Sequence, residues 1–165
     1  MAKSQKLQHR DERIGHDLTE LVSPFGYKPC QDLKLPGRYT RAWWFHRSGS
    51  QFRSELIFFV IYSRPNLVLE PRFLGAKLSL EALTARGAEG NVVGLSPFHY
   101  QFYALGIPAS ELLGQVIYLK PEELWPVKLE ALKREFQRIH PGIWAELWEG
   151  HHRNVERGID TPMPS

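Results

Sequence analysis

The chain has 165 residues, of which 42% are hydrophobic and 24% are charged, and its formal net charge is +3 at pH 7. These values exclude a largely disordered chain and a strongly basic, histone-like protein. The length suits a single domain over residues 1–165, with loose tails at 1–8 and 151–165.

An amphipathic helix is predicted near the N-terminus, from about Arg10 to Val22. Its apolar residues recur at helical spacing, namely Ile14, Leu18, Leu21 and Val22. The segment before it lacks the apolar stretch of a secretory signal. The longest apolar run, Leu56–Tyr62, is far too short to span a bilayer. We therefore expect a cytoplasmic protein with no membrane partner.

Three strands are predicted after this helix. Arg38–Arg47 and Gln51–Ser63 alternate apolar and polar residues, and the glycine-containing turn Ser48–Ser50 joins them as a hairpin. Leu67–Phe73 is predicted as a third strand. Pro71 places that strand at a sheet edge or a bulge, because proline donates no backbone hydrogen bond.

The following part of the chain predicts several short elements. They are a helix at Ser79–Arg86 capped by Ser79, ambiguous segments at Asn91–Leu95 and Phe98–Leu105, a helical turn at Ser110–Leu113 and a strand at Gln115–Leu119. The C-terminal part predicts two helices separated by a break. The first covers about Pro121–Ile139, with Pro126 as an alternative start, and the second covers Ile143–Glu149. Pro141 and Gly142 break the helical pattern between them.

The first of these C-terminal helices has a continuous apolar stripe. Its members are Trp125, Leu129, Leu132, Phe136 and Ile139. The order of helix, strands and helices predicts an α+β fold. We expect an antiparallel sheet of about four to five strands, with the N-terminal helix and the C-terminal helices packed mainly on one face.

The most informative feature of the sequence is an alternation of arginine and aromatic residues along the first hairpin strand. With the turn at Ser48–Ser50, Arg47 would pair with Gln51, and Glu55 would share the face of Arg47. The other face is the more apolar and is expected to pack on the helices; it holds Ala42, Trp44, His46, Phe52, Ser54, Leu56 and Phe58. The outward face is then predicted to bind a protein partner through Arg41, Trp43, Phe45, Arg47 and Arg53.

Two alternatives remain open for this hairpin face. It could be a solvated sheet surface on which arginine side chains cover aromatic rings. It could also bind nucleic acid, with bases stacked on Trp43 and Phe45 and arginines on phosphates. Neither the identity of a partner nor the oligomeric state follows from the sequence.

Motifs for catalysis are missing from the sequence. It contains no phosphate-binding loop and no nucleophile elbow. Cys30, the one cysteine, is interpreted as a half-buried thiol. The adjacent side chains of His151 and His152 diverge, so they do not predict a metal site. We therefore predict no catalytic residue, no metal and no cofactor. An unrecognised active site would need a pocket that holds His46 or His99 beside a carboxylate.

The layout resembles small bacterial α+β proteins, including immunity proteins of polymorphic toxin systems. The resemblance rests on the turn Phe25-Gly26-Tyr27 after the first helix, the strand Tyr39-Thr40-Arg41-Ala42-Trp43-Trp44-Phe45, and the C-terminal helical pair. It covers the order of elements over most of the chain and transfers no functional residue. It implies a non-enzymatic protein that blocks a protein partner, such as a toxin.

Overall fold

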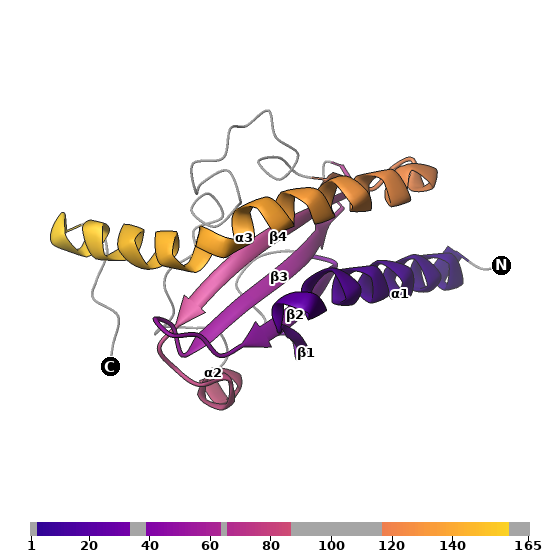
Figure 1. The fold of residues 1–165 in the computed structure, drawn as a ribbon. Coiled ribbons are helices and arrows are strands. Elements are labelled where there is room, and N and C mark those ends of the chain that lie inside the picture. Colours follow the sequence, from indigo (N-terminus) through magenta and orange to yellow (C-terminus); the bar gives the residue numbers. More distant parts are fainter. Residues whose placement is uncertain (1–2, 34–38, 64–65, 87–116, 159–165) are drawn as a thin grey trace.

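The computed structural model of the chain describes residues 3–33, 39–63, 66–86 and 117–158. It confirms the α+β prediction, because a five-stranded antiparallel sheet packs against helices (Figure 1). Each strand pairs with the next one along the chain. The strands are β1 (Lys28–Cys30), β2 (Arg41–Arg47), β3 (Ser54–Tyr62), β4 (Val68–Ala76) and β5 (Ile117–Tyr118). The helices are α1 (Lys3–Val22), α2 (Leu80–Arg86) and α3 (Trp125–Glu156), with single 3-10 turns η1 (Ser23–Phe25) and η4 (Glu122–Leu124).

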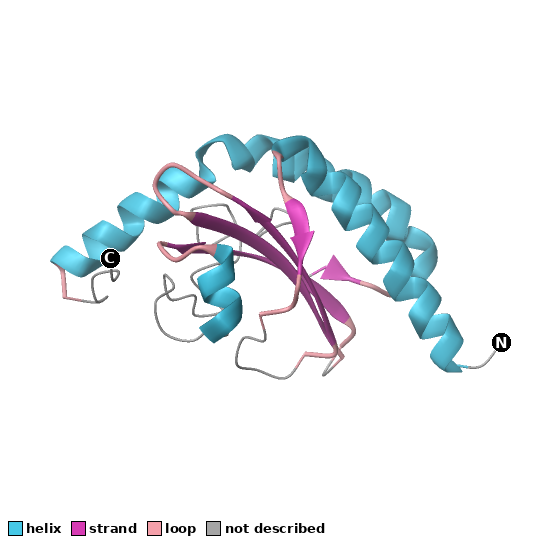
Figure 2. Ribbon diagram, turned by 90° about the horizontal axis from the view of Figure 1, so that it is seen from below, coloured by secondary structure: helices cyan, strands magenta, loops and turns pink. Residues whose placement is uncertain are grey.

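Helices α1 and α3 cover one face of the sheet, and α3 arches across it (Figure 2). The stripe predicted for α1 is fully buried there, as are four of the five residues predicted for α3. These side chains form one hydrophobic core with residues of the central strands, including Phe45, Ile57, Phe59 and Phe73. The two amphipathic patterns therefore did predict which helical faces are buried.

The opposite face of the sheet is also buried. Trp44 stacks on Phe58 with ring centroids 4.1 Å apart, and α2 adds Leu83 to this second core. The predicted Ser79 cap of α2 is present, since Ser79 Oγ accepts a hydrogen bond from the Ala82 amide at 3.2 Å. The sheet is thus a middle layer between two hydrophobic cores.

The predicted hairpin register is wrong. Arg47 pairs with Glu55 rather than with Gln51, so the connection spans 48–53 instead of 48–50. The longer loop is closed by a hydrogen bond from the Gly49 amide to the Phe52 carbonyl, at 3.1 Å. Phe52 is fully buried and contacts Trp144 edge to face. Burial of this one ring explains why the chain turns later than the glycine-containing tripeptide suggested.

The predicted break at Pro141 is also wrong, because α3 continues through it to Glu156. Proline removes one intrahelical hydrogen bond, at a cost of about 3 kcal/mol in a helix interior. Beyond Pro141 the helix buries Ile143, Trp144 and Leu147, and burial of each large side chain contributes about 1.5–3 kcal/mol. Packing therefore outweighs the lost bond. The tail predicted to be loose from residue 151 is helical as far as Glu156.

Helix α1 and strand β4 also differ from the prediction. Helix α1 begins at Lys3, so residues 3–8 of the predicted loose tail are helical. Strand β4 continues through Pro71 and lies between β3 and β5 rather than at an edge. β5 pairs only with Val68 and Leu69 of β4, so its ladder does not reach Pro71. The predicted segments at 91–95, 98–105 and 110–113 lie outside the described residues.

A search of the described helices for membrane spans found none that combines the required length with sufficient apolar character.

Two glycines in helices offer a matched test of this packing. A Cβ atom added at Gly15 of α1 would lie 2.5 Å from Nε1 of Trp43, whereas one added at Gly142 of α3 meets nothing within 4 Å. We expect Gly15→Ala to lower the free energy of unfolding by about 1–2 kcal/mol, because the indole must move. Gly142→Ala should raise it by about 0.5–1 kcal/mol through helix propensity. Urea denaturation measures both, and equal effects would contradict the close approach of α1 to β2.

Candidate functional site

The five residues predicted to bind a partner do not form one surface. The sheet face that carries Trp43 and Phe45 lies beneath α1 and α3, so the prediction that it points outward is wrong. Phe45 is only 1% exposed and belongs to the core. Trp43 is partly buried against that core, with the Arg41 guanidinium 5.5 Å from its ring centre. Both faces of the sheet are apolar and buried, so the alternation of residues along the strand does not show which face the long helices cover.

Arg47 and Arg53 lie at the other end of β2 from Arg41, next to the hairpin loop. Arg53 is exposed, whereas Arg47 is largely buried in an ion pair. Its Nε donates to Oε1 of Glu55 at 2.7 Å, and its Nη1 donates to the Phe25 carbonyl at 2.8 Å. Its guanidinium also lies 4.6 Å from the ring centre of Tyr27. These contacts hold Arg47 in one orientation.

Glu55 is the buried partner in this ion pair. Its side chain is 3% exposed. Burial raises the pKa of the Glu55 carboxyl, while the hydrogen bond and the positive charge of Arg47 lower it. The buried Glu55 carboxylate therefore depends on Arg47 to remain ionised.

A hydrogen-bonded chain next to this pair ties α3 to the segment after α1. Trp144 Nε1 donates to the Tyr27 hydroxyl at 2.6 Å, and that hydroxyl is hydrogen-bonded to His140 Nε2 at 2.8 Å. Burial, and to a smaller extent the positive charge of Arg47, lower the pKa of His140 to about 4. His140 is therefore neutral at pH 7. All three groups are buried, so their shared role is to dock α3.

A groove of about 540 Å³ opens beside β1, one of the two edge strands of the described sheet. Its lining comprises Gly26, Lys28, Pro29, Cys30, His46, Arg47, Ser48 and Leu80. Lys28 and Arg47 are basic and none of the described lining residues is acidic, so we call it the basic groove. Gly26 adopts a φ of 92°, which ends η1 and turns the chain into β1. Lys28 is exposed and forms no ion pair with another described residue.

Cys30 and His46 give the basic groove no nucleophile. Burial raises the pKa of Cys30 to about 11, so the thiol stays protonated at neutral pH. His46 Nε2 lies 3.2 Å from Ser54 Oγ, whose own proton goes to the Leu78 carbonyl at 2.8 Å. Nε2 is therefore the donor to the serine. Because no described lining residue is a carboxylate, the pair that an unrecognised enzyme site would need is not assembled in this groove. The second candidate, His99, lies outside the described residues.

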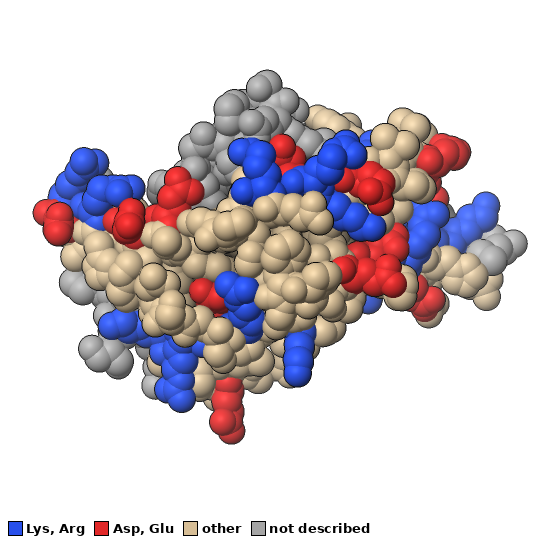
Figure 3. Space-filling view, viewed as in Figure 1, with Lys and Arg blue, Asp and Glu red and all other residues tan. Residues whose placement is uncertain are grey.

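Charges of both signs are interspersed over the face that carries α1 and α3 (Figure 3). Ion pairs along α3 contribute to this pattern. Lys133 Nζ lies 3.3 Å from Glu130 Oε1, and Arg138 Nη2 lies 2.6 Å from Glu135 Oε2. A mixed surface of this kind produces no long-range positive field over that face. The basic groove and Arg53 of the hairpin connection are local positively charged features.

Comparison with known proteins found no match: no family model fits the chain, and no curated protein or solved structure is similar to it.

The buried His140 makes stability depend on pH in a defined direction. Its pKa of about 4 lies below the ordinary value of 6.5, so the unfolded chain binds a proton more readily between pH 6.5 and 4. Stability attributable to His140 is therefore present above pH 6.5 and is lost as the pH falls through this window. Between pH 7 and 4.5, the unfolding free energy of the wild type should fall about 1–3 kcal/mol further than that of His140→Gln.

Glu55 acts in the opposite direction, because its raised pKa favours protonation of the folded state. It is present in both proteins, so the difference between wild type and His140→Gln isolates the histidine. Urea titrations at each pH provide the measurement. Parallel pH curves would show that His140 is not buried in a neutral form.

Removing Arg47 should leave the Glu55 carboxylate buried without a partner. We expect Arg47→Met to lower the free energy of unfolding by about 3–5 kcal/mol at pH 8. The double variant Arg47→Met/Glu55→Gln should be less destabilised than Arg47→Met alone, because it no longer buries a charge. Chemical denaturation of the four proteins in this cycle measures the coupling. Additive effects would rule out the buried ion pair.

Proposed function

We propose that this protein is a small cytosolic protein without catalytic activity that binds and occludes a protein partner, and that its basic groove receives acidic side chains of that partner. The observation that carries the proposal is the lining of the groove, which includes Lys28 and Arg47 and, among the described residues, no acidic one. Groups of this charge steer an acidic partner and fix its register.

The two basic residues contribute in different ways. Arg47 is held by Glu55 and the Phe25 carbonyl, so little conformational entropy remains to be lost on binding. Lys28 is exposed and retains an uncompensated charge within the described structure. Arg53, at the end of the hairpin loop, adds a third positive charge at the same end of β2.

The groove favours side-chain recognition over strand addition. β1 is an edge strand and has only three residues, with Pro29 in its centre. Proline has no N–H with which to extend the sheet, and such residues commonly block edge pairing. An extended peptide therefore gains few main-chain hydrogen bonds here, whereas carboxylates gain contacts with Lys28 and Arg47.

The resemblance to immunity proteins makes a toxin the partner that we propose. The described order of an N-terminal helix, antiparallel strands and a C-terminal helix supports this assignment at the level of element order, although one long α3 replaces the expected helical pair. Nucleic-acid binding through stacked bases is less well supported, because Phe45 is only 1% exposed.

Charge reversal at the groove tests the proposal. The tagged wild type and the variant Lys28→Glu/Arg53→Glu are used as bait in lysate of the source organism, with and without nuclease. The matched control is Lys6→Glu/Arg13→Glu, which makes the same charge change at exposed positions of α1. Lys6 lies 16 residues before the end of α1, about 24 Å along the helix axis.

We expect wild type and control to retain one protein in near-equal amount despite nuclease, and the groove variant to retain at least about tenfold less. Circular dichroism confirms that each variant is folded. Equal recovery by all three baits would overturn the role of the groove. Recovery of nucleic acid that nuclease removes would overturn the protein-binding function itself.

A further inference from the structure

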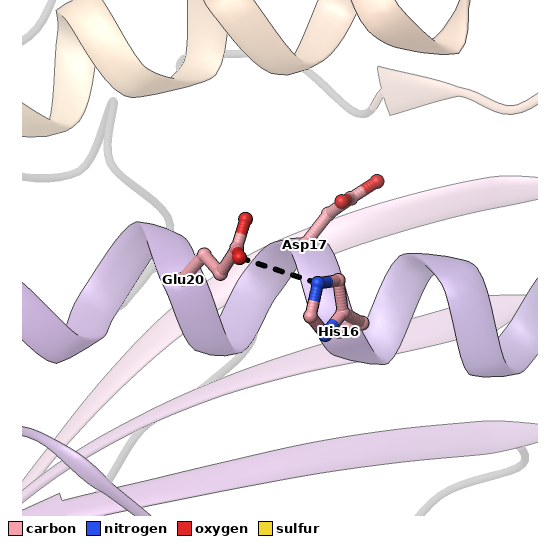
Figure 4. Close-up of side chains that lie close together, drawn as sticks. All are labelled: His16, Asp17 and Glu20. Carbon is pink, nitrogen blue, oxygen red and sulfur yellow. Dashed lines mark ion pairs between the residues drawn. The ribbon is translucent and has the colours of Figure 1, made fainter.

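A second cluster of polar side chains lies on α1, away from the basic groove. It consists of His16, Asp17 and Glu20, whose nearest ligand atoms all lie within 4.8 Å of one another. In Figure 4, His16 and Glu20 are joined by an ion pair, and Asp17 points from the next position of the helix toward α3. We propose that these three residues bind a divalent transition-metal ion such as Zn²⁺.

The spacing of His16 and Glu20 fits ligands of one ion. They are one helical turn apart, and His16 Nε2 lies 3.2 Å from Glu20 Oε1. Two N or O ligands at the usual distances of about 2.0–2.2 Å from one zinc ion lie about 3.0–3.5 Å from each other. The ion therefore fits between these atoms without a change in the helix.

Asp17 is the third ligand: although it is adjacent to His16 in the chain, its ligand atom lies within 4.8 Å of those of His16 and Glu20, and its carboxylate is oriented by α3. Its Oδ2 accepts a hydrogen bond from Trp125 Nε1 at 2.8 Å. A carboxylate has two oxygens, so coordination through one of them is chemically compatible with a hydrogen bond accepted by the other. Outer hydrogen bonds of this kind orient metal ligands in proteins. Binding would thereby couple α1 to the first turn of α3.

The donor set selects the class of ion. One imidazole nitrogen and two carboxylate oxygens suit zinc, cobalt or nickel, whereas calcium and magnesium prefer oxygen ligands alone. The side chains of His16 and Glu20 are 70% and 63% exposed, so water can occupy the remaining coordination positions. An exposed histidine and glutamate one turn apart also form an ion pair without a metal. The experiment must therefore distinguish metal binding from this ion pair alone.

Co²⁺ and Zn²⁺ serve as the probes, in a Cys30→Ser background that removes the one thiol ligand. Calorimetry with Zn²⁺ and the visible absorption of bound Co²⁺ measure binding to the full chain. The test variants are His16→Ala, Glu20→Gln and Asp17→Asn, the last of which keeps a side-chain oxygen for Trp125. The matched control is His9→Ala, an exposed histidine on the same helix.

We expect His16→Ala to weaken Zn²⁺ binding at least tenfold, and each carboxylate variant at least threefold, while His9→Ala changes it less than twofold. Zn²⁺ should also raise the melting temperature of the wild type but not of His16→Ala, because the ion binds only the folded cluster. Mg²⁺ should do neither. Equal Zn²⁺ affinity in wild type and His16→Ala, or no binding at millimolar Zn²⁺, would overturn the site and leave only the ion pair.

Discussion

Strand β3 contains hydrophobic residues on both of its faces, and eight of its nine residues are buried. A strand of this kind must be covered from two sides, because each exposed apolar face would lose the free energy of burial. On one side the cover is α1 and α3; on the other, α2 contributes Leu83 and Leu33 packs beside it. The continuation of α3 through Pro141 follows from the same need, since Ile143 and Trp144 beyond it complete the first core.

Burial of both faces restricts where this protein can present a binding surface. A sheet with one open face could display a row of arginine and aromatic side chains, but here that row lies beneath helices. What remains accessible in the described structure are strand edges, loops and the outer sides of helices. The basic groove lies at such an edge, where β1 ends the sheet and Pro29 prevents a further strand from extending it. The architecture thus favours recognition by a few charged side chains at an edge over recognition by a broad aromatic patch.

The features that the sequence predicted best are those with a strong local period. The stripes of α1 and α3 and the antiparallel order of β2, β3 and β4 follow from spacing, whereas the short strand β1 was not predicted. The hairpin register does not, because it depends on the burial of Phe52 between Gly75 and Trp144, which are distant in sequence. The prediction that one face of the β2–β3 hairpin is exposed was wrong. The continuous apolar run Leu56–Tyr62 indicates a strand that is buried on both faces. The basic groove could not be predicted, since its lining comes from 26–30, 46–48 and Leu80, which only the fold brings together.

Arg47 lines the groove and also forms the buried ion pair with Glu55, so a substitution there would affect both the groove and the stability of the fold. Its guanidinium keeps Glu55 charged inside the fold, so it cannot vary without a loss of stability. Lys28 and Arg53 are exposed, and the described structure shows no ion pair for either of them. Substitution of these two residues costs the fold little, since exposed charges contribute little to stability. If the proposed groove binds a partner, specificity could change at Lys28 and Arg53 at little cost to the fold, whereas Arg47 is tied to the core through its ion pair with Glu55.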